Sequence, residues 1–301
     1  METKKPFTIL GLSIWRVMAY FIIYSVIGYI IETLFGLLTM GILESRQSFL
    51  YGPFCGIYGI GATLMIIGMQ KLPKTYNWLF LGGFILGSVT EYFISWTSEK
   101  FAGITWWDYS YMPLNINGRV CLLYSIFWGL LAIYLMGYFN LKVDRCMNWI
   151  KTKISTKVLK GFVLSIFIFI VVEFIATAIA IQVFLIRMEK QNDLDVPNKE
   201  ETVQLYEQIY GNPKLAEFIY KYWGDEKMIK TFPNLKIEDR EGQTIYINKL
   251  LPDIKPYYIK IPFLTGRINH MRGFGGLSDL GGVRMAYLDW LDPSKLRVAA
   301  F

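Results

Sequence analysis

Three carboxylates lie inside long apolar segments of the sequence, where a charged group is costly. They are Glu32, Glu91 and Glu173, each flanked by runs of aliphatic and aromatic residues. Burying an ionised side chain at the centre of a bilayer costs about 2.5–3.5 kcal/mol even on insertion scales, so such a residue is a functional candidate by default. A buried carboxylate can bind a substrate or an ion, or take part in acid–base chemistry if burial raises its pKa.

Two short polar segments between the apolar runs hold most of the other reactive side chains. Arg119 stands at the expected N-terminus of a helix, where the helix dipole disfavours a cation, so we expect Glu32, Glu91 or Asp108 to compensate it. Arg46 raises the same question. The sequence therefore predicts one polar cluster near the outer membrane interface, made of Glu32, Arg46, Glu91, Asp108, Asn115, Asn117 and Arg119.

Three interpretations of these residues stay open. They form a network of ion pairs and hydrogen bonds that fixes helix packing, or a binding site for a substrate or an ion, or they are unrelated surface residues. The sequence assigns no catalytic residue. Glu173 has no obvious basic partner, so it is expected either to be protonated or to face Glu32 or Glu91.

Five apolar segments must position these groups. A helix needs about 20 residues to cross roughly 30 Å of hydrocarbon. With 53% hydrophobic residues, the composition is typical of a membrane protein rather than a soluble one. We expect an all-α polytopic membrane protein with about five transmembrane helices, over residues 17–39, 53–69, 78–96, 120–139 and 162–186. The second segment is short and rich in glycine, and the glycines of the second and third segments favour close helix packing.

The last third of the chain has a different pattern. Residues 199–223 show helical periodicity, residues 243–264 mix β-prone pieces with prolines, and the end is rich in glycine. We expect a transmembrane helical domain over residues 1–186. A C-terminal extramembrane region should follow over residues 187–301, as a soluble α+β or partly disordered appendage whose role the sequence does not reveal.

The distribution of positive charge predicts the orientation. With the N-terminus in the cytoplasm, eleven lysines and arginines flank the spans on the inside and five on the outside. The excess favours a cytoplasmic N-terminus and an extracytoplasmic C-terminal region in the cell membrane. The inside residues are Lys4, Lys5, Arg16, Lys71, Lys74, Lys142, Arg145, Lys151, Lys153, Lys157 and Lys160, and the outside ones are Arg46, Lys100, Arg119, Arg187 and Lys190.

Several classes of site are disfavoured by composition. A single histidine, His270, cannot supply a multi-histidine metal site, and no CxxC motif occurs. We therefore expect no metal and no cofactor. The basic excess lies in the membrane half rather than on a soluble face, so nucleic acid is not an expected partner. Cys55 and Cys121 either pair or are small buried hydrophobes.

Two signatures in the first half of the chain resemble one family. The first is Phe49-Leu50-Tyr51-Gly52-Pro53-Phe54-Cys55-Gly56-Ile57-Tyr58-Gly59-Ile60-Gly61-Ala62. The second comprises Trp106-Trp107-Asp108-Tyr109, Asn115-Ile116-Asn117-Gly118-Arg119, Cys121-Leu122-Leu123-Tyr124 and Trp128-Gly129. Over about residues 14–145 the chain is similar to the CmpB-like family, described as ABC-transporter type IV. The fifth span and the C-terminal region lie outside this resemblance.

The resemblance implies a transport component, similar to a permease subunit. The sequence has no Walker A motif, so ATP hydrolysis would need a separate ATPase subunit or other membrane subunits. Only residues 144–160, on the inside, are long enough to dock such a subunit; the same stretch is either an amphipathic helix on anionic lipid or a plain positive-inside loop. The alternatives are a membrane-embedded enzyme acting on lipid or cell-envelope precursors at the outer face, and a membrane scaffold or regulator. An enzyme is the less favoured class.

Overall fold

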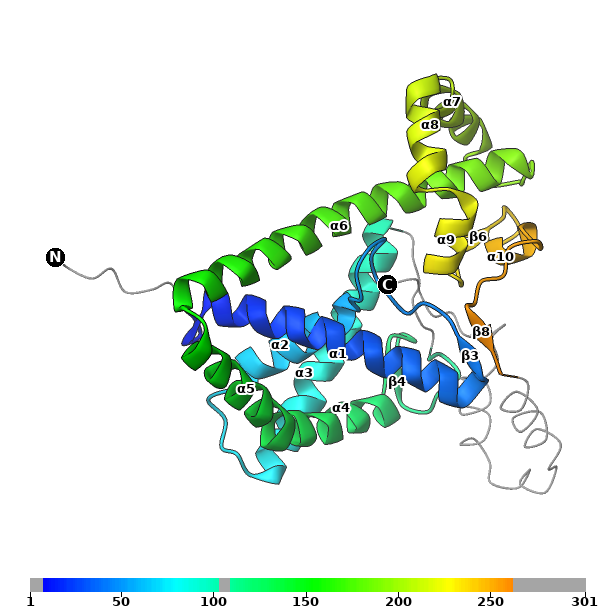
Figure 1. Cartoon of the computed structure of the whole chain (residues 1–301). Coiled ribbons are helices and arrows are strands. Elements are labelled where there is room, and N and C mark those ends of the chain that lie inside the picture. The colour runs from blue at the N-terminus through cyan, green and yellow to red at the C-terminus, as the bar shows by residue number, and fades with distance from the viewer. Residues whose placement is uncertain (1–7, 103–108, 262–301) are drawn as a thin grey trace. The chain divides into compact units, whose positions relative to one another are not determined.

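The computed structural model describes residues 8–102 and 109–261, and its larger elements are helices (Figure 1). The helices of the apolar part are α1 (Ile14–Met40), α2 (Gly56–Met69), α3 (Tyr76–Ala102), α4 (Leu122–Tyr134), the π-helix η1 (Leu135–Phe139), α5 (Asn140–Lys153) and α6 (Thr156–Gln191). Two small antiparallel hairpins flank them, β1 (Thr8–Ile9) with β2 (Leu12–Ser13) and β4 (Asn115–Ile116) with β5 (Val120–Cys121).

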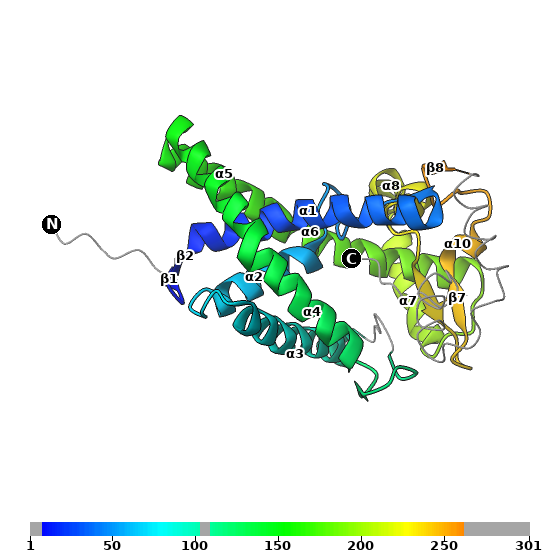
Figure 2. The same cartoon turned by 90° about the horizontal axis from the view of Figure 1, so that it is seen from below.

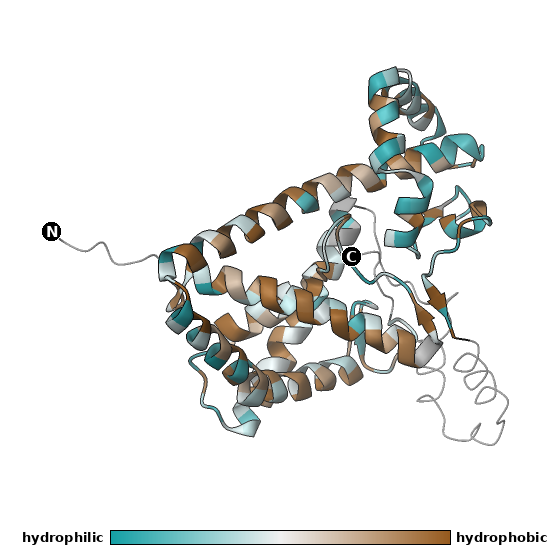
Figure 3. Ribbon diagram, viewed as in Figure 1, coloured by the Kyte–Doolittle hydropathy of each residue, from teal (hydrophilic) through white to brown (hydrophobic). Residues whose placement is uncertain are grey.

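Within the described residues, four helices are long and apolar enough to cross a membrane. They cover Ile14–Leu38, Tyr76–Thr97, Leu122–Lys153 and Thr156–Gln191. In Figure 3, brown apolar residues predominate along α1, α4 and the first part of α6, whereas α5 and the C-terminal helices carry much more teal. The chain is a multi-pass membrane protein.

The second predicted span is a shorter apolar helix. Helix α2 has 14 residues and is therefore about 21 Å long, less than the roughly 30 Å of hydrocarbon. The fourth predicted span, residues 120–139, begins with the two residues of β5 and otherwise lies in a longer helix. Here α4, η1 and α5 follow one another without a break over 32 residues, so this helix is about 48 Å long.

The chain forms two compact units, each built from separate stretches of sequence. Among the described residues, the first unit contains 8–28 and 56–168, and the second contains 29–55 and 169–261. Both α1 and α6 therefore contribute to each unit. The domain boundary predicted at residue 186 stays a prediction.

Glycines allow the helices of the first unit to approach closely. Helices α3 and α4 lie side by side (Figure 2). A Cβ added at Gly83 would collide with Ala132, and one added at Gly87 would collide with the Trp128 side chain. A Cβ at Gly59 of α2 would collide with Phe21 of α1. The packing role predicted for the glycines of these spans is confirmed at these positions, as expected where small residues line helix interfaces.

The second unit contains the C-terminal elements and has its own hydrophobic core. These elements are α7 (Lys199–Tyr210), α8 (Pro213–Tyr222), α9 (Asp225–Thr231), β6 (Lys236–Glu238), β7 (Thr244–Tyr246), α10 (Ile247–Leu250) and β8 (Ile259–Lys260). Strands β6 and β7 form an antiparallel hairpin, and β8 pairs with β3 (Ile42–Leu43), which follows α1. The core contains Leu50, Ala180, Ile181, Phe184, Met188, Val196, Met228, Ile229, Phe232, Leu235, Ile237 and Ile247.

Candidate functional site

Glu91 is a buried acid in the first unit, placed where α3 packs against α4. Its side chain is 7% exposed. One carboxylate oxygen accepts a hydrogen bond from the Tyr109 hydroxyl at 2.9 Å, and the other accepts one from the Trp128 indole nitrogen at 3.1 Å. Both donors are neutral, and none of the ion pairs formed within residues 8–102 and 109–261 includes Glu91. The two hydrogen bonds meet the requirement that a buried carboxyl be partnered.

Tyr109 and Trp128 are themselves held in place. The Tyr109 ring stacks on Tyr124, with ring centroids 4.6 Å apart. Burial and the neighbouring Glu91 carboxylate raise the pKa of Tyr109, so its hydroxyl stays protonated and continues to donate. Trp128 packs over Gly87, where the missing side chain leaves room for the indole. The donors around Glu91 are therefore pre-positioned by aromatic stacking and by a glycine contact.

The predicted polar turn is a hairpin just before α4. Asn117 and Gly118 both have positive φ, of 53° and 67°, and the Arg119 amide donates to the Ile116 carbonyl at 3.0 Å. Positive φ at two successive residues is typical of a type I′ turn, for which Asn-Gly is the preferred sequence. The Asn115 side chain accepts from the Gly118 amide and donates to the Met112 carbonyl. Asn115 therefore shapes the loop.

Tyr92 connects this hairpin to the helix that carries Glu91. The Asn117 amide donates to the Tyr92 hydroxyl at 2.9 Å, and the Arg119 guanidinium lies 5.8 Å from the centre of the Tyr92 ring. The structure thus brings Asn117 and Arg119 to the residue next to Glu91. Asp108 lies outside the described residues. The acidic partner of Arg119 therefore stays a prediction.

The two remaining predicted site residues lie in the second unit. Arg46 forms an ion pair with Glu44, at 2.6 Å, and both side chains are largely buried. Burial raises the pKa of Glu44, and the Arg46 charge opposes that rise. This pairing answers the question of what compensates Arg46. Glu32 lies on α1 and is half-buried. Membership of Glu32 and Arg46 in one cluster with Glu91 stays a prediction.

Glu173 has a clear role in the second unit, where it holds the loop that carries the first signature. Its carboxylate accepts from the Tyr51 amide at 3.0 Å, and one turn later the Thr177 hydroxyl accepts from the Leu50 amide at 2.9 Å. These two acceptors stand four residues apart on one face of α6. The loop turns sharply just after these two amides, at Gly52, which has φ of 88°.

A cation from the C-terminal region lies beside this loop. The Lys227 ammonium is 4.5 Å from the centre of the Tyr51 ring. Burial lowers the pKa of Lys227, and the charge of Glu173 partly offsets this effect. The basic neighbour that Glu173 lacked in the sequence therefore comes from α9, more than 50 residues away along the chain.

A second polar ladder in the first unit joins α1 to α5. Arg16 pairs with Asp144 at 2.6 Å, the Tyr20 hydroxyl donates to the same carboxylate, and the Tyr24 hydroxyl donates to Asn140 at 3.0 Å. Sequence reasoning missed this ladder. Its signal was the spacing: the α1 residues are four apart, and so are the α5 residues, which places each set on one helical face.

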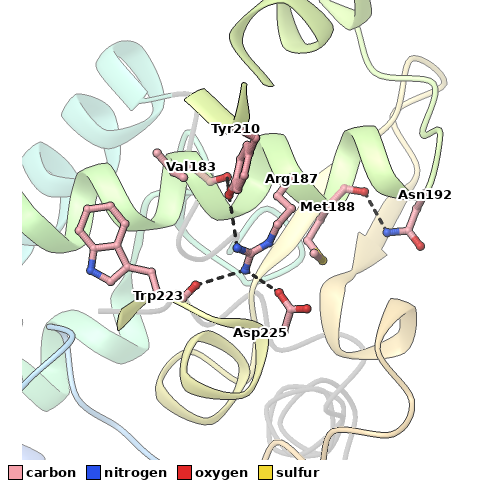
Figure 4. A network of polar contacts seen from close by, with 7 residues as sticks. All are labelled: Val183, Arg187, Met188, Asn192, Tyr210, Trp223 and Asp225. Atoms are coloured by element: carbon pink, nitrogen blue, oxygen red, sulfur yellow. Dashed lines mark hydrogen bonds and ion pairs between the residues drawn. The ribbon is translucent and has the colours of Figure 1, made fainter. Parts of the chain in front are cut away.

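Arg187 is the most deeply buried cation among the described residues, with 0% of its surface exposed. Figure 4 shows its guanidinium donating to the Tyr210 hydroxyl, the Trp223 carbonyl and the Asp225 carboxylate, at 3.3, 3.2 and 2.5 Å. The centre of the Tyr220 ring lies 5.0 Å away. Arg187 thus fastens α6 to the C-terminal helices, a structural role.

Neither a disulfide bond nor a metal-binding cluster is formed by the described residues. Cys55 and Cys121 are both buried, and the described residues include no disulfide bond. In the same part of the chain, no three His, Cys, Asp or Glu side chains gather as a metal site would require.

Comparison with known proteins identifies the family. The family model described as "Putative ABC-transporter type IV" matches residues 19–178. This match covers more than half of the 301 residues, and the chain belongs to this family. Membership supports a transport-related role for this multi-pass membrane protein. No curated protein and no solved structure matches the chain.

The extent of the match corrects the sequence analysis in one respect. The resemblance was expected to end near residue 145, but the family model continues to residue 178, through the first part of α6. It therefore includes Glu173 and Thr177, the two acceptors that hold the first signature loop.

Proposed function

We propose that this protein is the permease-like membrane component of a transporter. The observation that carries the proposal is the environment of Glu91: a carboxyl group buried inside a membrane-spanning helix and bound by two neutral aromatic donors. Membership of a transporter family, together with an acid placed inside the membrane, favours a role for Glu91 in binding the transported solute. Tyr109 and Trp128 complete the site. Asn117 and Arg119 contact Tyr92, the residue that follows Glu91.

The proposed partner is a separate ATPase subunit. The sequence contains no Walker A motif, so the chain would have to receive the energy of ATP hydrolysis through contact. Helix α5 suits that contact because it extends a helix already long enough to cross the membrane. The Arg16–Asp144 pair fixes α5 to α1, while Lys142, Arg145 and Trp149 stay exposed.

We also propose five crossings, with α2 as the short one. If α2 did not cross, Lys71 and Lys74 would lie on the same side as Arg46, and the excess of inside charge would be lost. The glycines of α2 allow other helices to pack closely around it. The polar ends of this short helix, together with the preceding loop, can then be surrounded by protein, where irregular backbone is tolerated inside a membrane. The N-terminus is then cytoplasmic and the C-terminal region extracytoplasmic.

The test uses membranes in which any partner subunit is present. Inverted vesicles from cells that express wild-type protein, Glu91→Gln or the surface control Glu217→Gln are energised with ATP or with a proton gradient. Uptake of a panel of cationic, neutral and anionic solutes is then measured. The proposal expects uptake that requires the wild-type chain, falls several-fold in Glu91→Gln and is unchanged in Glu217→Gln.

The same vesicles separate the other candidate functions. If no solute depends on the chain, while lipid extracts show a conversion that requires Glu91, the protein is a membrane enzyme. If neither activity depends on Glu91 although the variant is folded and present in normal amounts, the buried acid serves packing alone. Either result overturns the proposal.

A further inference from the structure

Helix α8 exposes an apolar stripe that the described residues of the second unit leave uncovered. Leu215, Phe218 and Tyr222 are 41%, 45% and 42% exposed. Their spacing of three and four residues places them on one helical face. Ile219, on the adjoining face, is buried. The helix therefore packs into the unit with one side and presents aromatic and aliphatic side chains with the other.

Lysines border this stripe. Lys214 and Lys221, seven residues apart, are both exposed and lie along one edge of it. The Lys221 ammonium is 5.2 Å from the centre of the Tyr222 ring. Aromatic residues with lysines beside them are typical of helices that lie in a membrane interface, where the rings sit at headgroup depth and the ammonium groups reach lipid phosphates.

The stripe is held rigidly. Asn212 caps the start of α8 by accepting from the Lys214 and Leu215 amides, and Pro213 occupies the first turn. At the other end, buried Arg187 donates to the Trp223 carbonyl and to Asp225 (Figure 4). Both ends of the helix are therefore fixed to the rest of the second unit.

Burial along α6 shows where the lipid-facing surface ends within this unit. Val172, Phe174 and Ile175 are largely exposed, as expected of side chains that meet lipid. From Ala180 onward the inward-facing residues, among them Phe184, are buried in the core of the second unit. The change implies that α6 leaves the hydrocarbon a few residues after Glu173.

The C-terminal end of α8 lies close to the point where α6 leaves the hydrocarbon. The Tyr51 amide is bonded to Glu173, and the hydroxyl of the same Tyr51 lies 3.5 Å from the Tyr222 carbonyl oxygen. One tyrosine side chain thus spans the distance between the lipid-facing part of α6 and the end of α8. In Figure 1, α8 turns away from the line of α6 instead of continuing it.

We propose that α8 is an interfacial helix whose Leu215, Phe218 and Tyr222 lie in the headgroup layer of the bilayer. The occupant of the exposed stripe is lipid, and Lys214 and Lys221 meet its phosphate groups. Tyr51 connects the end of this stripe to the lipid-facing part of α6, and the charge of the two lysines complements that of lipid phosphate. The inference needs only the membrane-spanning character of α6, not the proposed transport function.

The test places a fluorescent probe on the stripe of the full-length protein. Phe218→Cys and the control Glu217→Cys, which lies on the polar side of α8, are made in a Cys146→Ser background and labelled with the polarity-sensitive dye NBD. Each variant is assembled as single copies in nanodiscs, with or without lipid that bears a nitroxide on its headgroup. The probe at 218 should be blue-shifted and quenched several-fold more than the probe at 217.

Three results would overturn the inference. Equal, water-like emission and weak quenching at both positions would show that the stripe faces solvent. Protection at 218 only when two copies share a disc would show that a second copy covers it. Leu215→Gln makes the same face more polar, so it should weaken the quenching of a probe placed at Tyr222→Cys. Unchanged quenching would also count against the proposal.

Discussion

Single side chains show how an acid is kept within a membrane helix. Glu91 is held by a phenol and an indole, two groups that can donate a hydrogen bond without adding charge. A sequence pattern identifies Glu91 because a carboxylate in an apolar run is conspicuous. It does not identify Tyr109 or Trp128, because aromatic residues near a membrane are common as anchors and as core. Their presence within the second signature was the available signal.

Glu91 and Tyr109 should be energetically coupled. In a double-mutant cycle of Glu91→Gln and Tyr109→Phe, we expect a coupling of about 0.5–3 kcal/mol. Tyr109→Phe removes the hydrogen bond whose acceptor Glu91→Gln changes from a carboxyl to an amide, while Phe keeps the stack on Tyr124. The measurement is thermal unfolding in detergent. A cycle of Tyr109→Phe with Tyr92→Phe is the control, and it should be additive because Tyr92 bonds Asn117. Additive losses in both cycles would remove the support for a shared site.

The buried pair Glu44–Arg46 makes stability depend on pH. Burial raises the folded-state pKa of Glu44 above its usual value of 4.5. A carboxyl whose pKa is higher in the folded state contributes full stability below the unfolded pKa and loses it as pH rises through the folded pKa. As pH rises above the unfolded pKa of Glu44, wild type should therefore lose stability relative to Glu44→Gln, which does not titrate.

The measurement for this pH effect is the difference in unfolding temperature between wild type and Glu44→Gln across the pH range. Arg46→Met provides the second arm, because Arg46 opposes the rise in the pKa of Glu44. Removing it should steepen the loss of stability with pH. A difference that is flat with pH in both arms would show that Glu44 ionises as freely as in the unfolded chain.

Whole helices were the part of the fold that hydropathy could predict. The positions of α1, α3 and α6 follow from apolar length, since a bilayer sets a minimum run of residues. The length of the helix formed by α4, η1 and α5 could not be predicted this way, because α5 is held by polar contacts to α1 rather than by apolar content. The same criterion could not decide how α2 behaves, since its 14 residues fall between a span and a buried segment.

Glycines at the α3–α4 contact should be intolerant of substitution. Gly83→Ala and Gly87→Ala force a methyl group into Ala132 or Trp128, so we expect losses of about 1–3 kcal/mol from overpacking. Gly61→Ala is the matched control. It lies in α2 with nothing within 4 Å of the added Cβ, and it should be neutral or stabilising by about 0.4–1 kcal/mol. Equal unfolding temperatures for all three variants would contradict the close contact.

At the scale of the whole chain, orientation is the prediction with the broadest consequences. We expect single-cysteine variants at Glu201 to be labelled from outside intact cells and variants at Lys153 to be protected, in a background lacking the exposed Cys146. Labelling at 153 but not at 201 would reverse the topology and place the C-terminal region in the cytoplasm.

The organisation into two units was beyond sequence reasoning. Hydropathy divides the chain once, near residue 186, because it registers only a change in composition. Burial of Ala180, Phe184 and Arg187 shows that the end of the apolar helix α6 is also the centre of a soluble-type core. A phenylalanine such as Phe184 is equally suited to a lipid-facing position and to a protein core, so its environment cannot be inferred from its residue type.

The π-helical turn η1 makes one helix serve two neighbours. A turn with one additional residue rotates every later side chain by about 100°, so that Trp128 before the turn meets α3 and Asp144 after it meets α1. The phase of the second half is therefore set by a single residue. Deleting Gly137 should leave both halves helical but rotate Asn140 and Asp144 away from Arg16, Tyr20 and Tyr24. Cysteine cross-linking between positions 16 and 144 would measure the loss of this contact. In this protein, a length change of one residue would act as a change of partner.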